Sequence, residues 1–168
     1  MRGDRAAQRQ LYDAFAPLVF GIALRYGRTR PEAEDFSQEA WLLLFRKLDR
    51  YSGEGSFEGW VRRLTANCCL SGLRRGGLDL TEIPPVLPAG TYVEPEAPSQ
   101  LGAAELARHV ASLPEGYRLV FNLVAVEGFS HAEAAAALGI TESSSRSQLT
   151  RARSALQQRI AKSNVSCP

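Results

Sequence analysis

Hydrophobic residues recur every three or four positions along most of this chain, and this spacing predicts helices rather than strands. In the first half, the pattern is interrupted by a polar stretch, YSGEGS, at 51–56, and Pro31 marks the start of a helix. No convincing strand pattern occurs in this half. We therefore expect three helices here, at 11–27, 30–48 and 57–75.

The second half has the same helical spacing with clearer end signals. Ser130 followed by Glu133 is the pattern of a capping box, Gly128 and Gly139 are stop signals, and Thr141 is suited to cap the next helix. These signals predict four helices, at 100–113, 114–128, 130–139 and 142–161.

The middle of the chain does not follow the helical pattern. Five of the nine prolines lie within 76–100, where they exclude a continuous helix, and the segment is acidic. This composition is typical of a linker. The expected fold is therefore all-α, with two small helical domains at 1–76 and 101–163, joined by a flexible, acidic, proline-rich linker at 77–100.

The charges lie in blocks, although the formal net charge is only +2. Residues 59–77 hold four arginines and no acid, 76–107 hold five acids and no base, and 142–162 hold five bases and one acid. This order predicts two separated basic patches with an acidic connector.

Three cysteines and two histidines, without a CxxC motif, do not form the pattern of a zinc site. We expect no metal and no cofactor. The polar N-terminus is unlike a signal peptide, and no apolar run approaches the ~18 residues of a membrane span. We therefore expect a cytoplasmic protein with no direct membrane insertion.

Motifs of known catalytic sites are absent from the sequence. The sequence has no glycine-rich phosphate loop, no HExxH and no nucleophile elbow, so we do not expect an enzyme. Redox sensing through the adjacent Cys68 and Cys69 is an alternative. However, Cys68 lies four residues after Leu64 on the apolar side of its helix, which favours a buried structural thiol.

A short alanine-rich helix, the turn GIT and a longer basic helix form the pattern of a helix-turn-helix, whose second helix enters the major groove of DNA. A helical wheel of that second helix places hydroxyl and arginine side chains opposite the apolar ones. Short hydroxyls allow close approach to a groove, and arginine contacts guanine or phosphate. An ordinary helix with a solvated basic face is the alternative.

Ser145 does not follow the wheel. It lies on the face expected to be buried, with Leu149, Ala152 and Leu156. We expect its hydroxyl to bond back to a carbonyl of the preceding turn, as serines in helices often do.

Taken whole, the second half resembles region 4 of bacterial sigma factors of the extracytoplasmic-function type, in the segment LPEGYRLVFNLVAVEGFSHAEAAAALGITESSSRSQLTRARSAL. In the first half, EDFSQEAWLLLFRKLDRY resembles region 2.2, and FEGWVRRLTANCCLSGLRR resembles regions 2.3 and 2.4. Both matches occur in the family's order, either side of the linker. The chain is thereby identified as a member of this sigma-70 subfamily over about residues 8–160.

The resemblance implies a transcription initiation factor that binds core RNA polymerase and directs it to promoter DNA. Region 2 would recognise and melt the −10 element, and region 4 would recognise the −35 element. An anti-sigma factor, often membrane-bound in this family, is an implied partner. A plain helix-turn-helix repressor, or the output domain of a response regulator, would account for the second half only.

Site residues follow from the family motifs, position by position. Contacts with the β′ clamp helices of core polymerase are implied for Asp35, Gln38, Glu39 and Leu42. Contacts with the −10 element are implied for Ser56, Phe57, Trp60, Arg63, Asn67, Arg74 and Arg75. Contacts with the −35 element are implied for His131, Ser143, Ser144, Arg146, Ser147, Thr150 and Arg151.

Alternatives remain for these sites. Residues 35–42 could be a solvated acidic face, Trp60 could pack in the core, and Asn67 could be an ordinary exposed residue. The chain also departs from the family pattern, with Ser145 where an aliphatic residue is common and Gln148 where arginine is common. The promoter sequence therefore cannot be inferred.

Overall fold

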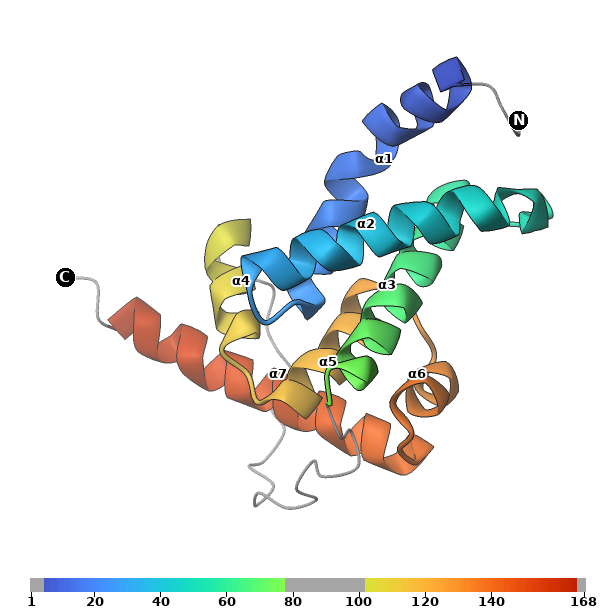
Figure 1. The fold of residues 1–168 in the computed structure, drawn as a ribbon. Coiled ribbons are helices and arrows are strands. Elements are labelled where there is room, and N and C mark those ends of the chain that lie inside the picture. Colours follow the sequence, from blue (N-terminus) through green and yellow to red (C-terminus); the bar gives the residue numbers. More distant parts are fainter. Residues whose placement is uncertain (1–4, 78–101, 166–168) are drawn as a thin grey trace. The chain divides into compact units, whose positions relative to one another are not determined.

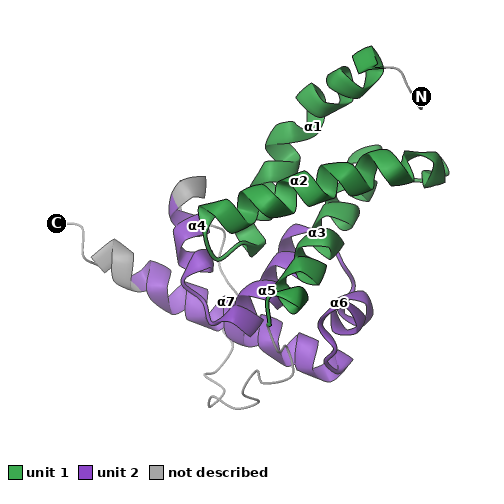
Figure 2. Cartoon of the chain, in the orientation of Figure 1, with its two compact units in different colours: residues 1–78 green, residues 79–168 purple. Residues whose placement is uncertain are grey.

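The computed structural model describes residues 5–77 and 102–165. The chain divides into two compact units, residues 1–78 and 79–168 (Figure 2). Every regular element in the described ranges is helical, which confirms the predicted all-α fold of two helical domains. The predicted linker, apart from Gly77, lies outside the described residues.

The first unit is a bundle of three helices that all pack against one another (Figure 1). They are α1 (Arg5–Tyr26), α2 (Arg30–Lys47), which continues into the 3-10 turn η1 (Leu48–Arg50), and α3 (Phe57–Arg75). The Thr29 hydroxyl caps α2 by accepting the Glu32 N–H at 3.3 Å, and a proline follows in the first turn. The third helix has the predicted bounds.

Helix α1 begins six residues earlier than the predicted start at 11. The added turn, RAAQRQ, has no apolar stripe to reveal it, but alanine, arginine and glutamine are strong helix formers. An exposed pair between Arg9 and Asp13, 3.0 Å apart, links this turn to the rest of the helix.

Helices α2 and α3 approach closely at Gly72. A Cβ atom built there would overlap the ring of Phe36, lying 2.9 Å from its Cδ1 atom. Phe36 is buried, and the core around it is apolar and densely packed. The absence of a side chain at Gly72 therefore allows the two helices to bury Phe36 between them.

The second unit contains α4 (Ala103–Ala111), α5 (Glu115–Phe121), the π-helical turn η3 (Asn122–Val126), α6 (His131–Leu138) and α7 (Glu142–Val165). Helix α7 packs against α4, α5 and α6. Its buried side chains share a core with Val110, Leu113 and Tyr117.

The predicted helix at 114–128 keeps α-helical geometry only to Phe121. It then widens, and the Glu127 N–H bonds the Asn122 carbonyl at 2.9 Å, five residues back. Gly128 follows with φ 75°, a left-handed conformation that suits glycine. The segment therefore stops where the sequence predicts, after a π-helical turn that it does not predict.

The end signals around the helix-turn-helix are confirmed. Ser130 and Glu133 form the reciprocal bonds of a capping box, and Gly139 ends α6 in the left-handed conformation with φ 68°. The Thr141 hydroxyl accepts the Ser144 N–H at 3.1 Å and so caps α7. Local side-chain chemistry thus fixes the turn between the two helices.

Candidate polymerase and nucleic-acid interfaces

Helix α2 presents a continuous exposed strip. Asp35 and Gln38 are exposed, and Leu42, one helical turn further, is 64% exposed. Phe36 and Leu44 on the other side are buried in the bundle. An exposed leucine beside an acid and an amide is costly to hydrate and well placed to contact a partner.

Glu39, the fourth predicted polymerase contact, is half-buried. Its carboxylate forms an ion pair with Arg75 at the end of α3, a residue predicted to contact DNA. Both side chains stay substantially exposed, so the pair contributes little to stability. The structure thus brings together two residues for which the family motifs imply different partners.

Cys68 lies beside the same carboxylate, with its Sγ atom 4.0 Å from Glu39 Oε2. Burial, and then the negative charge of Glu39, raise the pKa of the Cys68 thiol. Cys68 and Cys69 are both buried, and neither is in a disulfide within the described residues. A buried thiol held in its protonated form is a poor nucleophile, which argues against redox sensing at this pair.

An aromatic cluster forms where the 51–56 loop enters α3. The Phe57 ring lies 5.1 Å from that of Tyr51, 5.5 Å from that of Trp60 and 5.3 Å from that of Phe15, measured between centroids. Phe57 and Trp60 are both half-buried. Trp60 therefore packs among aromatic neighbours while keeping part of its surface accessible.

The loop leading to this cluster owes its shape to glycine and to local hydrogen bonds. Gly53 and Gly55 have φ of 81° and 75°, conformations that other residues rarely adopt. The Tyr51 hydroxyl donates to the Gly55 carbonyl at 2.8 Å, and the Ser56 hydroxyl caps α3 by accepting the Gly59 N–H at 3.3 Å. Ser56, a predicted DNA contact, thus has a structural bond already.

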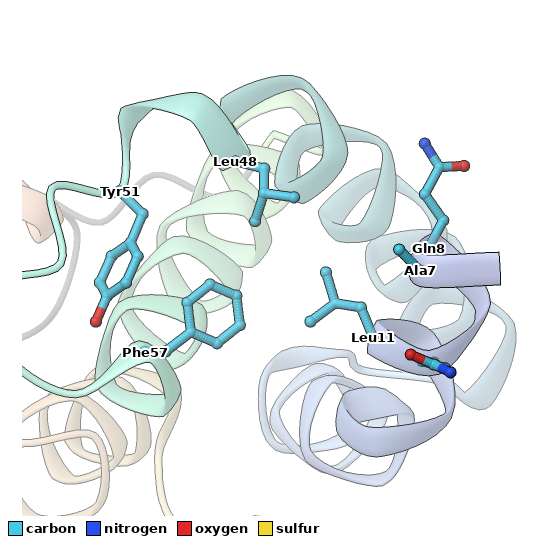
Figure 3. Close-up of a pocket in the computed structure, with 7 residues that line it drawn as sticks. Ala7, Gln8, Leu11, Leu48, Tyr51 and Phe57 are labelled. Atoms are coloured by element: carbon cyan, nitrogen blue, oxygen red, sulfur yellow. The ribbon is translucent and has the colours of Figure 1, made fainter. Parts of the chain in front are cut away.

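A pocket of about 460 Å³ adjoins the cluster (Figure 3). Leu48, Tyr51 and Phe57 line one side of it, opposite Leu11. The remaining lining comes from the first turns of α1, at Ala7, Gln8 and Gln10. The sequence did not reveal this pocket because these turns carry no apolar stripe.

Two of the arginines of α3, Arg63 and Arg74, share one exposed face with Asn67. Arg63, Asn67 and Arg74 are exposed and spaced by four and seven residues, so they follow one side of the helix. Ser71 lies between them and bonds back to the Asn67 carbonyl at 2.9 Å. This face is polar along its length and carries positive charge at both ends.

Helix α7 separates its polar and buried faces as the wheel predicts. Leu149, Ala152 and Leu156 are buried. The six predicted −35 contacts of α7 lie outside this core. Ser144 and Arg151 are half-buried, and the four exposed ones are Ser143, Arg146, Ser147 and Thr150.

The hydroxyl groups on this face are held by their own helix. Ser147 donates to the Ser144 carbonyl at 3.0 Å, and Thr150 donates to the Arg146 carbonyl at 3.1 Å. Arg146 forms an exposed ion pair with Glu142. The resulting surface has short side chains, a cationic group and the N-terminal end of a helix, a combination suited to phosphate and base edges.

Ser145 is fully buried, but its bond differs from the prediction. Its Oγ atom lies 2.9 Å from Nδ1 of His131, at the start of α6. Within the described residues the hydroxyl forms no bond back to a carbonyl of the preceding turn, so that expectation was wrong. A helical wheel identifies a face of one helix and carries no information on a partner fourteen residues away.

The burial of Gln148 was not predicted either. It is only 6% exposed, and its Oε1 atom has no hydrogen-bond partner among the described residues. The helical wheel could not predict this burial, because it places position 148 between the exposed and buried faces.

None of the described helices combines the length and hydrophobicity needed to cross a membrane. Residues of the described ranges also form no cluster of histidine, cysteine and carboxylate side chains suited to a metal ion.

Comparison with known proteins agrees with this arrangement. The models of sigma-70 region 2 and sigma-70 region 4 match residues 11–78 and 103–156. The ECF RNA polymerase sigma factor SigE of Mycolicibacterium smegmatis is 33% identical over 95% of this chain, which spans 65% of that relative's length. The ECF RNA polymerase sigma-E factor of Escherichia coli K12 is 27% identical, with 95% of this chain and 89% of the relative covered.

Two solved structures share the fold. One is the sigma factor RpoE of Bartonella quintana in complex with the anti-sigma factor NepR, with a TM-score of 0.58 and 22% identity over 91% of this chain and 96% of that one. The other is CnrH in complex with the cytosolic domain of CnrY, with a TM-score of 0.52 and 22% identity over 96% and 92%.

Proposed function

The chain belongs to the sigma-70 family, in its extracytoplasmic-function group, and we propose that it is a transcription initiation factor that binds core RNA polymerase and directs it to promoters. One observation carries the proposal. Regions 2 and 4 follow one another in a single chain, and each match falls within its own compact helical unit. A repressor with a helix-turn-helix would need only the unit that matches region 4.

For core polymerase, the proposed contact surface is the exposed strip of α2 at Asp35, Gln38, Glu39 and Leu42. Support comes from Leu42, whose large exposed fraction is unusual for leucine in a helix that buries its other face. The occupant would be the β′ clamp helices, as the family resemblance implies. Apolar contact at Leu42 would supply affinity, and the acid and amide would supply orientation.

For the −10 element, the proposed surface combines the aromatic cluster with the basic face of α3. Phe57 and Trp60 are partly accessible, and aromatic faces stack on unpaired bases of any sequence. Arg63, Asn67 and Arg74 would follow the backbone of the melted strand and the adjoining duplex. Arg75 would exchange Glu39 for phosphate at little cost, because exposed ion pairs are weak.

For the −35 element, α7 is proposed to enter the major groove. Its exposed face carries short hydroxyls that permit close approach, and Arg146 and Arg151 would contact bases or phosphates. The buried face is fixed to the unit by Leu149, Ala152 and Leu156. Promoter recognition would therefore not require a change in the fold of this unit.

An anti-sigma factor is the further proposed partner. RpoE of Bartonella quintana and CnrH were both solved in complex with a second protein, NepR and the cytosolic domain of CnrY respectively. We infer by analogy that this chain is held inactive in the cytoplasm by such a partner. The partner would have to compete for a surface that core polymerase needs.

Run-off transcription tests the proposed function. The full chain is combined with core RNA polymerase and a library of promoter fragments, and transcripts are sequenced. We expect transcripts that depend on the chain and share two upstream elements, together with retention of the chain on core polymerase in a pull-down. DNA binding without retention on core polymerase would instead support a repressor.

A further inference from the structure

Ser145 is a buried hydroxyl for which the proposed DNA contacts provide no role. It is 0% exposed on the inner face of α7. Serine and threonine in helices commonly donate to the carbonyl four residues earlier, as Thr150 does to Arg146 at 3.1 Å. Ser145 makes no such bond in the described residues. Its Oγ atom instead lies 2.9 Å from Nδ1 of His131.

The direction of this bond is coupled to the tautomer of the imidazole ring. A fully buried hydroxyl requires an acceptor for its own hydrogen, and Nδ1 of His131 is the acceptor in reach. When Nδ1 accepts, the neutral ring carries its proton on Nε2. His131 is only half-buried, and its Nε2 atom has no hydrogen bond within the described residues. The ring therefore has an unused donor on its other side.

We propose that Ser145 is a positioning residue for DNA binding, which orients the His131 ring so that its Nε2–H donates to a phosphate beside α7. This inference rests on the proposed function, in which α6 and α7 face the −35 element. His131 is the first residue of α6, where the helix end also favours an anion. The serine thus contributes to DNA binding from inside the unit.

The inference also accounts for the departure from the family pattern. An aliphatic residue at position 145 would fill the same space without bonding the imidazole. The ring could then rotate or carry its proton on Nδ1, which would place the lone pair of Nε2 toward a phosphate. A hydroxyl at this position and an imidazole at position 131 therefore form a matched pair.

The tautomer of the His131 ring gives the first test. The full chain, labelled with 15N, is studied by NMR at mildly alkaline pH, and the neutral form of the ring is analysed. We expect the Nε2–H form to dominate in the wild type and the Nδ1–H form to gain population in Ser145→Ala. A wild-type ring that carries its proton on Nδ1 would overturn the proposal.

A double-mutant cycle gives the second test. The chain is assembled with core polymerase, and its affinity is measured for the duplex promoter that run-off transcription recovers. His131→Ala is expected to weaken binding about tenfold and Ser145→Ala about threefold, since each affects one hydrogen bond to a charged group. Ser145→Ala should have no further effect when His131 is already alanine. If Ser145→Ala reduces promoter affinity equally with and without the His131 imidazole, the hydroxyl acts on packing alone, and the proposal is contradicted.

Control variants distinguish failure of the proposed function from failure of the proposed role of Ser145. Ser154→Ala, on the same helix and outside the proposed contacts, should bind like the wild type, and Ser145→Thr should restore the hydroxyl and most of the affinity. Thermal unfolding confirms that each variant is folded. Absence of any promoter binding by the wild type would refute the proposed function, whereas binding unchanged by Ser145→Ala would refute only the role of Ser145.

Discussion

At the scale of single residues, three charged groups of the proposed interfaces already form ion pairs within the chain. Glu39 pairs with Arg75, and Arg146 pairs with Glu142. Such exposed pairs contribute only about 0–1 kcal/mol, so a binding partner can replace them at small cost. Because each of these charges is paired, a substitution of one also removes the ion pair of its partner.

Leu42 is expected to anchor the contact with core polymerase. Gln38→Ala combined with Leu42→Ala should weaken core binding by about ten- to a hundredfold, because truncation of a central apolar anchor costs roughly 1–3 kcal/mol. Affinity for core polymerase, measured with a fluorescently labelled chain, provides the test.

Leu24 offers a matched control for that variant, since it is 46% exposed on α1 of the same unit. Leu24→Ala should leave core binding nearly unchanged. Wild-type affinity in the Gln38/Leu42 variant would remove the α2 strip from the proposed interface.

Cys68 is expected to resist alkylation in the folded chain. Its raised pKa keeps the thiol protonated at neutral pH, and burial restricts access of the reagent. Mass spectrometry after treatment with iodoacetamide should show slow labelling of Cys68 and Cys69, and rapid labelling in denaturant. Because the unfolded thiol ionises first, raising the pH above its ordinary pKa should also lower the stability of the fold. Fast labelling of the native pair would revive the redox alternative.

The sequence predicts a residue's environment best where neighbours in the same helix determine that environment. The buried and polar faces of α7 followed from spacing alone, because residues one turn apart share a side of the helix. Burial of Gln148 and the Ser145 bond to His131 depend on a second helix, so spacing could not reveal them. Whether the site residues contact DNA or polymerase stays a prediction.

At the scale of elements, caps and glycines position the surfaces. Ser130, Gly139 and Thr141 fix the ends of α6 and α7, and their roles were predictable because a cap involves residues only a few positions apart. The π-helical turn at Asn122–Val126 was not predictable, since its apolar spacing is compatible with an ordinary helix. Gly72 could not be interpreted from the sequence either, because its neighbour Phe36 belongs to another helix.

Gly72→Ala is expected to destabilise the first unit by about 1–3 kcal/mol. The new methyl group would overlap the buried Phe36 ring, and overpacking of a dense core carries a cost of this size. Chemical denaturation followed by tryptophan fluorescence measures the effect, since both tryptophans lie in this unit.

Gly59→Ala is the matched control on the same helix. A Cβ atom there would meet only Ser56 Cβ, at 3.8 Å, so the change should be neutral or stabilising by up to ~1 kcal/mol. Equal destabilisation by the two substitutions would show that helix propensity, rather than the Phe36 contact, explains Gly72.

At the scale of the whole molecule, the chain is two helical units with separate proposed tasks. The first would hold core polymerase and the −10 element, and the second would hold the −35 element. The order of the two matches was predictable because each family motif is continuous in sequence. The pocket was not predictable, since two segments far apart in the sequence, the first turns of α1 and residues 48–57, build it.

The measurement that tests this division most directly compares core binding with promoter-specific transcription in one variant, Arg146→Ala combined with Arg151→Ala. The account predicts wild-type affinity for core polymerase, because α2 is unchanged, and loss of at least ~90% of run-off transcripts that depend on the −35 element, because two cationic DNA contacts are removed. Loss of core binding in this variant, or full transcription from the same promoters, would contradict it.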